Sequence, residues 1–80
     1  MKGTYTVARI EYMYDCRFEI QTRFGDGSLS AVGETTVRRR APDAVTAETL
    51  CRAALARKPT QIVGACTSVR FNRRKPIVVD

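Results

Sequence analysis

Hydrophobic and polar residues alternate most regularly between Cys16 and Phe24. One face of this segment carries Cys16, Phe18, Ile20, Thr22 and Phe24, and the other carries Arg17, Glu19, Gln21 and Arg23. A period of two residues is typical of a β-strand with one buried face and one solvated face. The sequence therefore predicts a strand over 16–24 with its aromatic residues in the core.

The segment before it, Thr4–Tyr14, is rich in the strand formers Tyr, Val, Thr and Ile. Its alternation changes parity between Val7 and Ala8, and a β-bulge there reconciles the two halves. We expect Thr4–Tyr14 and 16–24 to be two strands, joined by a turn at residues 15–17.

After a Gly-rich turn at residues 25–28, alternation resumes over Leu29–Arg40, which predicts a third strand. Pro42 ends it, and a helix follows from Asp43 or Thr46 to Lys58, because either residue can cap the first turn. Arg57 and Lys58 are expected in the last turn. The buried stripe of this helix consists of Ala47, Leu50, Cys51, Ala54 and Leu55.

The remaining residues predict a strand over Thr60–Asn72, a basic connector, and a short final strand over Pro76–Val79. In the fourth strand, Val63, Ala65, Thr67, Val69 and Phe71 are expected to share one face. The fold class is α+β: a small antiparallel sheet of four to five strands with one helix packed on one face, in the order β-β-β-α-β-(β).

Size and composition limit the possibilities further. Eighty residues make a single domain, and a hydrophobic fraction of 44% favours a folded chain. No apolar run approaches the ~18 residues that span a bilayer, and the N-terminus lacks a signal-peptide pattern, so we expect a cytoplasmic protein. Three widely spaced cysteines agree with that, and we interpret them as free thiols or small core residues.

Charge changes the picture most, because it is uneven along the chain. Residues 1–37 hold 4 Lys/Arg and 5 Asp/Glu, a net charge of −1, whereas residues 38–80 hold 10 Lys/Arg and 3 Asp/Glu, a net charge of +7. The strands flanking the helix run in the same direction, so their carboxyl ends meet at one end of the sheet. We therefore predict one basic rim for a polyanionic or acidic partner, formed by Arg38, Arg39, Arg40, Arg73, Arg74 and Lys75.

Weaker candidates for partner contacts are Arg17, Tyr12 and Tyr14, and Tyr5 is a further aromatic residue that the sheet can present to a partner. Phe18 and Phe24 alternate with charged residues, which favours the core for both. The alternative interpretation of the basic rim is that charged loops simply keep a small domain in solution.

Catalytic chemistry is poorly supported by the sequence. The chain has no His, the usual general base and metal ligand at neutral pH, and its carboxylates form no closely spaced pair. We expect a protein that is not an enzyme and that has no cofactor or metal site.

The whole 80-residue plan resembles the small anti-CRISPR proteins of phages and mobile elements, especially inhibitors of type I systems. The resemblance lies in an opening hairpin over 1–24, the turn at 25–28 and one helix within 41–59. It implies a stoichiometric inhibitor in the cytosol of a bacterial host that binds a type I CRISPR effector complex and blocks recognition of target DNA. Many such inhibitors are acidic and mimic DNA, whereas this chain has a net charge of +6, which suits an acidic protein surface or the nucleic acid within the complex better.

Two other hypotheses stay open. The same basic rim also suits a small RNA- or DNA-binding module, whose affinity would fall with salt. Alternatively, the chain is a structural protein that pairs with other copies through an edge strand.

Overall fold

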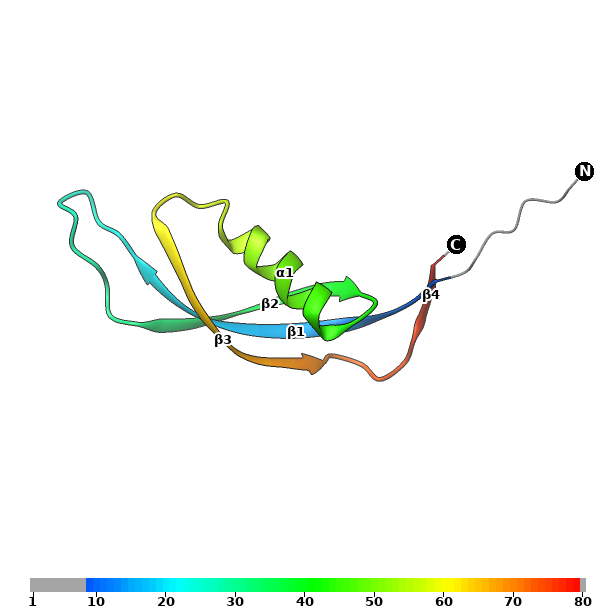
Figure 1. Cartoon of the computed structure of the whole chain (residues 1–80). Helices are drawn as coiled ribbons and strands as arrows, with labels where there is room; N and C mark the ends of the chain where they lie inside the picture. Colours follow the sequence, from blue (N-terminus) through cyan, green and yellow to red (C-terminus); the bar gives the residue numbers. More distant parts are fainter. Residues whose placement is uncertain (1–8, 80) are drawn as a thin grey trace, which may run out of the picture.

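The computed structural model describes residues 9–79, which form one helix and a four-stranded antiparallel sheet (Figure 1). The elements are β1 (Arg9–Thr22), β2 (Gly33–Ala41), α1 (Ala44–Leu55), β3 (Gln61–Phe71) and β4 (Ile77–Val79). The predicted α+β class, with a single helix and an antiparallel sheet, is confirmed for the described residues. The expected bulge at Val7–Ala8 and the aromatic residue Tyr5 lie outside them.

The first two predicted strands are one continuous strand, so the turn predicted at residues 15–17 is wrong. The physical reason is visible in the parity of the sequence, because Tyr14, Cys16 and Phe18 all point to one face and all are buried. Asp15 does not break the strand, because Arg38 and Asn72 satisfy its carboxylate. The order is therefore β-β-α-β-β, one strand fewer before the helix than predicted.

β1 is the centre of the sheet, and its neighbours are β2 on one side and β3 on the other. Tyr14 lies opposite Arg39 of β2 and opposite Phe71 of β3, so β2 and β3 end beside the same part of β1. β4 pairs with Arg9–Glu11, the part of β1 that precedes its pairing with β2 and β3. The carboxyl ends of the two strands that flank the helix thus meet at one end of the sheet.

The helix begins at its predicted cap, since the Asp43 side chain accepts a hydrogen bond of 2.7 Å from the Thr46 amide. It ends at Leu55, so Arg57 and Lys58 lie beyond the last turn, and Arg52 is its basic residue. Among residues 9–79 no helix has the length and apolar character that crossing a membrane requires.

The core is small. Its buried members are Tyr14, Cys16, Phe18, Ala41, Ala47 and Cys51, so α1 contributes two residues to the same cluster as β1. The molecule is elongated, with extents of 64 × 27 × 13 Å. Its radius of gyration of 16.9 Å exceeds the roughly 12 Å of a compact domain of this length. Figure 1 shows both ends of β1 extending past the helix.

Several predicted core residues lie at the surface instead. Phe24 is 52% exposed because the chain leaves the sheet after Thr22, and β2 begins only at Gly33 rather than at Leu29. Leu50 is 43% exposed because α1 is buried only along Ala47 and Cys51. In β3, shifts of register against β1 move Ala65 and Thr67 out of the buried face.

Candidate anion-binding groove

One face of the sheet is densely ionic. In β1, Tyr14, Cys16 and Phe18 point into the buried cluster, so the odd-numbered residues point to the opposite face. Directly opposite residues of paired strands share a face, so the registers also place residues of β2 and β3 there. We call this the polar face, and its ionic side chains are Arg9, Glu11, Asp15, Arg17, Glu19, Glu34, Arg38, Arg40 and Arg70.

Asp15 is the centre of a cross-strand network on the polar face. Its carboxylate accepts a hydrogen bond of 2.9 Å from Nε of Arg38 and one of 3.0 Å from Nδ2 of Asn72. The bond from Arg38 and, next, the bond from Asn72 hold the pKa of Asp15 below its ordinary value. Asp15 thus stays charged and fixes the Arg38 side chain, leaving the guanidinium's terminal nitrogens available to a partner.

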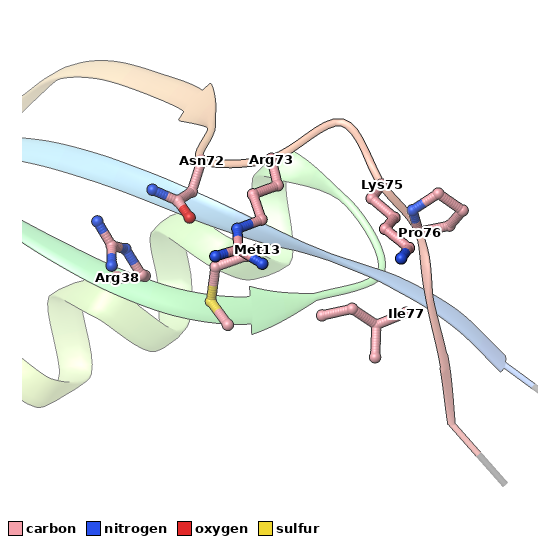
Figure 2. A pocket seen from close by; sticks show the side chains of 7 residues that line it. All are labelled: Met13, Arg38, Asn72, Arg73, Lys75, Pro76 and Ile77. Carbon is pink, nitrogen blue, oxygen red and sulfur yellow. The ribbon is translucent and has the colours of Figure 1, made fainter.

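A groove of about 510 Å³ opens beside this network (Figure 2). Three cationic side chains and three apolar ones line it together with Asn72: Arg38, Arg73, Lys75, Met13, Pro76 and Ile77. Figure 2 shows that the cations come from β2 and from the segment between β3 and β4. We call this the cationic groove. Among residues 9–79 no ion-pair partner is found for Arg73 or Lys75, so their charges can meet an anionic ligand.

A second, smaller depression of about 240 Å³ continues along the polar face. Arg17 and Arg70 line it, with Asp15 at its border. Asp15 lies between Arg38 and Arg70 in one cross-strand row. Its hydrogen bonds with Arg38 and Asn72, which line the cationic groove, connect the depression to that groove. Arg17, a weaker candidate from the sequence, therefore lies near the groove, in the middle of β1 rather than in a turn.

The predicted basic rim is divided among three places. Arg38, Arg73 and Lys75 come together at the cationic groove. Arg40 belongs to a different contact, because its Nε lies 2.9 Å from the carboxylate of Glu11, whose side chain is only 11% exposed. Arg39 lies on the other face of the sheet, opposite Tyr14, and donates to the Arg38 carbonyl.

Arg74 lies with an aromatic cluster on that other face. It lines a depression of about 370 Å³ with Tyr14 and Phe71. The Tyr14 and Phe71 rings are stacked with centroids 5.0 Å apart, and Tyr12 meets Phe71 edge-on at 5.2 Å. Tyr14 is buried, which raises the pKa of its phenol, and Tyr12 is half-buried, so Phe71, 48% exposed, is the most accessible ring of the three.

The thiols are placed for packing. Cys16 and Cys51 are buried and Cys66 is half-buried, and all three are free. Burial and, next, the neighbouring Cys51 thiol raise the pKa of Cys16 to about 12, which keeps it protonated and a poor nucleophile. Among the described residues no group of three or more His, Cys, Asp or Glu side chains could hold a metal ion.

Sequence reasoning missed Asp15, Asn72 and Arg70 as parts of the site. The sequence pattern places Asp15 in a turn and Asn72 at the end of a strand, and a polar residue is common at both kinds of position. The available signal was parity, because a strand that continues through Asp15 places it opposite both Arg38 and Arg70. Met13 and Ile77 carry no chemical signal, and only the pairing of β4 with β1 brings them to the groove.

Comparison of the chain with protein families, with curated proteins and with solved structures finds no match. What the site can do is therefore argued from its own geometry.

Proposed function

We propose that this chain is a non-catalytic binding protein that holds an acidic segment of a protein partner in the cationic groove. The observation that carries the proposal is the composition of the groove, where Arg73 and Lys75 lie beside the apolar side chains of Met13 and Ile77. An acidic peptide with apolar side chains matches this lining. Its carboxylates would pair with the two cations, and its apolar side chains would pack against Met13 and Ile77.

The arrangement of Arg38 supports this proposal. Its guanidinium is held by Asp15, so it loses less conformational freedom when it binds a carboxylate. A purely solvating surface has no need of such a network, because exposed cations are satisfied by water. Preorganisation favours recognition of one partner over general attraction to anions.

The resemblance in format to anti-CRISPR proteins names a specific partner for this groove, an acidic surface of a type I CRISPR effector complex. In that case binding blocks recognition of target DNA, one inhibitor to one complex. The positive charge of the groove suits a protein surface or bound nucleic acid, rather than mimicry of DNA.

Binding of free RNA or DNA is the second candidate, and the observation that favours it is the aromatic cluster. Phe71 is accessible and Arg74 lines the same depression, a pairing that stacks on bases and contacts phosphates in single-strand binding proteins. The cationic groove lies on the opposite face, so a strand bound to both would pass around the edge of β3.

The test uses a charge-reversed groove, Arg73→Glu with Lys75→Glu, and a matched control, Arg57→Glu with Lys58→Glu. Both variants change the net charge equally, and the control residues are exposed and outside the groove. We expect the wild type and the control variant to co-purify with a type I effector complex and to let phage infect cells that carry this CRISPR system. The groove variant should neither bind the complex nor rescue infection. Equal loss in both variants would mean that only net charge matters.

Fluorescence anisotropy with RNA and DNA strands separates the two candidates. Weak binding that disappears at physiological salt supports a protein partner. Binding that survives physiological salt, and that falls for Phe71→Ala, would favour the nucleic-acid module instead.

A further inference from the structure

The two outer strands of the sheet have free edges of different character. β2 and β3 each pair with β1 and with no other strand of the described chain. Among the described elements, β3 contacts only β1 and α1. A strand in this position presents a row of unpaired backbone N–H and C=O groups to its surroundings.

The edge of β2 is protected by charge. Four of its nine residues are ionic, Glu34 and the consecutive Arg38, Arg39 and Arg40. Pairing of two β2 strands would bring six arginines together, and like charges on facing strands repel. Charged edge residues are a common way in which proteins prevent such pairing.

The edge of β3 carries much less charge of its own. Its eleven residues contain a single charge, Arg70, and neither proline nor acidic residues. Gly64, Ala65 and Thr67 are exposed in its middle, and Phe71 is 48% exposed at its end. The irregular pairing with β1 bends the strand in this middle part. Within the described residues, the one cation that reaches its backbone there comes from α1, since Arg52 donates a hydrogen bond of 2.8 Å to the Gly64 carbonyl.

The chain also exposes more surface than a compact monomer. Its accessible surface is 5955 Å², against about 4,800 Å² expected for a compact protein of 8.9 kDa. Among residues 9–79 only six hydrophobic residues are buried. A second chain is one way to cover the excess.

We infer that β3 pairs antiparallel with β3 of a second copy, which joins two four-stranded sheets into one continuous sheet. Facing residues must point to the same side, and Val63 and Val69 do, since they lie opposite Ile20 and Cys16 of β1. A register with Val63 of one copy opposite Val69 of the other meets this condition. It also keeps the two Arg70 side chains at opposite ends of the pair.

The alternative pairings are less favourable. Pairing of β3 with β2 of another copy is head-to-tail, leaves a free edge at each end and grows into a filament. The two-fold pairing of β3 closes after two copies and leaves both protected β2 edges outermost. Because the interface is mainly one strand, we expect a reversible dimer with a dissociation constant of roughly micromolar order.

The experiment uses two variants of Ala65, which lies near the two-fold axis of the proposed pair: one introduces a positive charge there and the other a negative charge. Ala65→Lys and Ala65→Glu are each expected to raise the dimer dissociation constant about tenfold or more, as like charges oppose each other across the axis. Sedimentation velocity across a wide range of protein concentration measures this. Mixing the two variants should restore the dimer, because the opposite charges then face each other.

Thr36→Lys on the exposed part of β2 is the matched control and should leave association unchanged. Circular dichroism checks that each variant is folded. A wild-type chain that stays monomeric at every concentration overturns the inference, as does a dimer that Ala65→Lys leaves intact. Neither result bears on the cationic groove, whose test variants lie at Arg73 and Lys75.

Discussion

β2 and β3 are the two edges of one sheet and pair with the same stretch of β1, yet they differ in chemistry. β2 ends in three arginines, two of which are held by carboxylates of β1, Asp15 and Glu11. β3 carries a single charge, the exposed Arg70, and its other exposed residues are small or apolar. The difference teaches that the positive charge of the sheet is concentrated on one edge, where carboxylates of β1 hold part of it, whereas the other edge strand carries a single charge, Arg70.

The largest expected effect tests whether both edges depend on one core. Phe18 is fully buried between β2 and β3, opposite Thr35 and Cys66, and the Arg52 guanidinium lies 5.1 Å from its ring centroid. Phe18→Ala should cost about 3–5 kcal/mol of unfolding free energy, enough to unfold a domain of this size. Urea unfolding followed by circular dichroism measures it.

Phe18→Leu is the companion variant, because it keeps most of the volume and should cost less than about 1.5 kcal/mol. If β3 pairs with a second copy, higher protein concentration should partly restore the stability of either folded variant. If the Phe18→Ala chain stays folded and only one of the strands β2 and β3 loses its pairing with β1, the two edge strands are stabilised independently.

The second effect asks which β2 charges are structural. Arg40 pairs with the nearly buried Glu11, so Arg40→Ala leaves a carboxylate with little access to water and should cost about 1–2 kcal/mol. Arg39 has no carboxylate partner among the described residues, so Arg39→Ala should stay within about 0.5 kcal/mol. Thermal unfolding of the two variants in parallel provides the comparison, and equal costs would show that the Glu11 contact is not structural.

The sequence predicts the local features of this fold better than its long-range contacts. The helix cap at Asp43, the buried face of Cys16 and Phe18, and the meeting of the strand ends near Arg38 and Arg73 all follow from local patterns that the structure keeps. These patterns depend on neighbouring residues, so one sequence suffices to find them.

The predictions that are wrong have a common cause: these features depend on contacts between residues that are far apart in the sequence. Asp15 favours a turn when considered alone, but Arg38 and Asn72 stabilise it inside β1. The division of the basic rim depends on parity, which sends Arg39 to one face and Arg38 and Arg40 to the other. Phe24 is exposed because β2 begins only at Gly33, and no local pattern in the sequence predicts that starting point.

The smallest effect tests the link that Asp15 makes between the edges, because its carboxylate contacts Arg38 of β2 and Asn72, which directly follows β3. Its pKa is lower in the folded state, so its contribution to stability is complete above the ordinary value of about 3.9 and is lost as the pH falls through the lower folded value. Asp15→Asn should therefore reduce stability at neutral pH by less than about 1 kcal/mol, since Arg38 is largely exposed.

The same variant should show a shallower loss of stability in acid when urea unfolding is repeated from neutral pH to below pH 3. Part of the acid loss should remain, because the pKa values of Asp26 and Asp43 are also lowered, by hydrogen bonds with Ser28 and Thr46. Asp26→Asn is the matched control, since Asp26 lies in the exposed turn after Phe24 and contacts neither edge. If Asp15→Asn weakens partner binding in the cationic groove while Asp26→Asn does not, the carboxylate positions Arg38 for binding. If the two variants bind equally well, Asp15 only joins the strands.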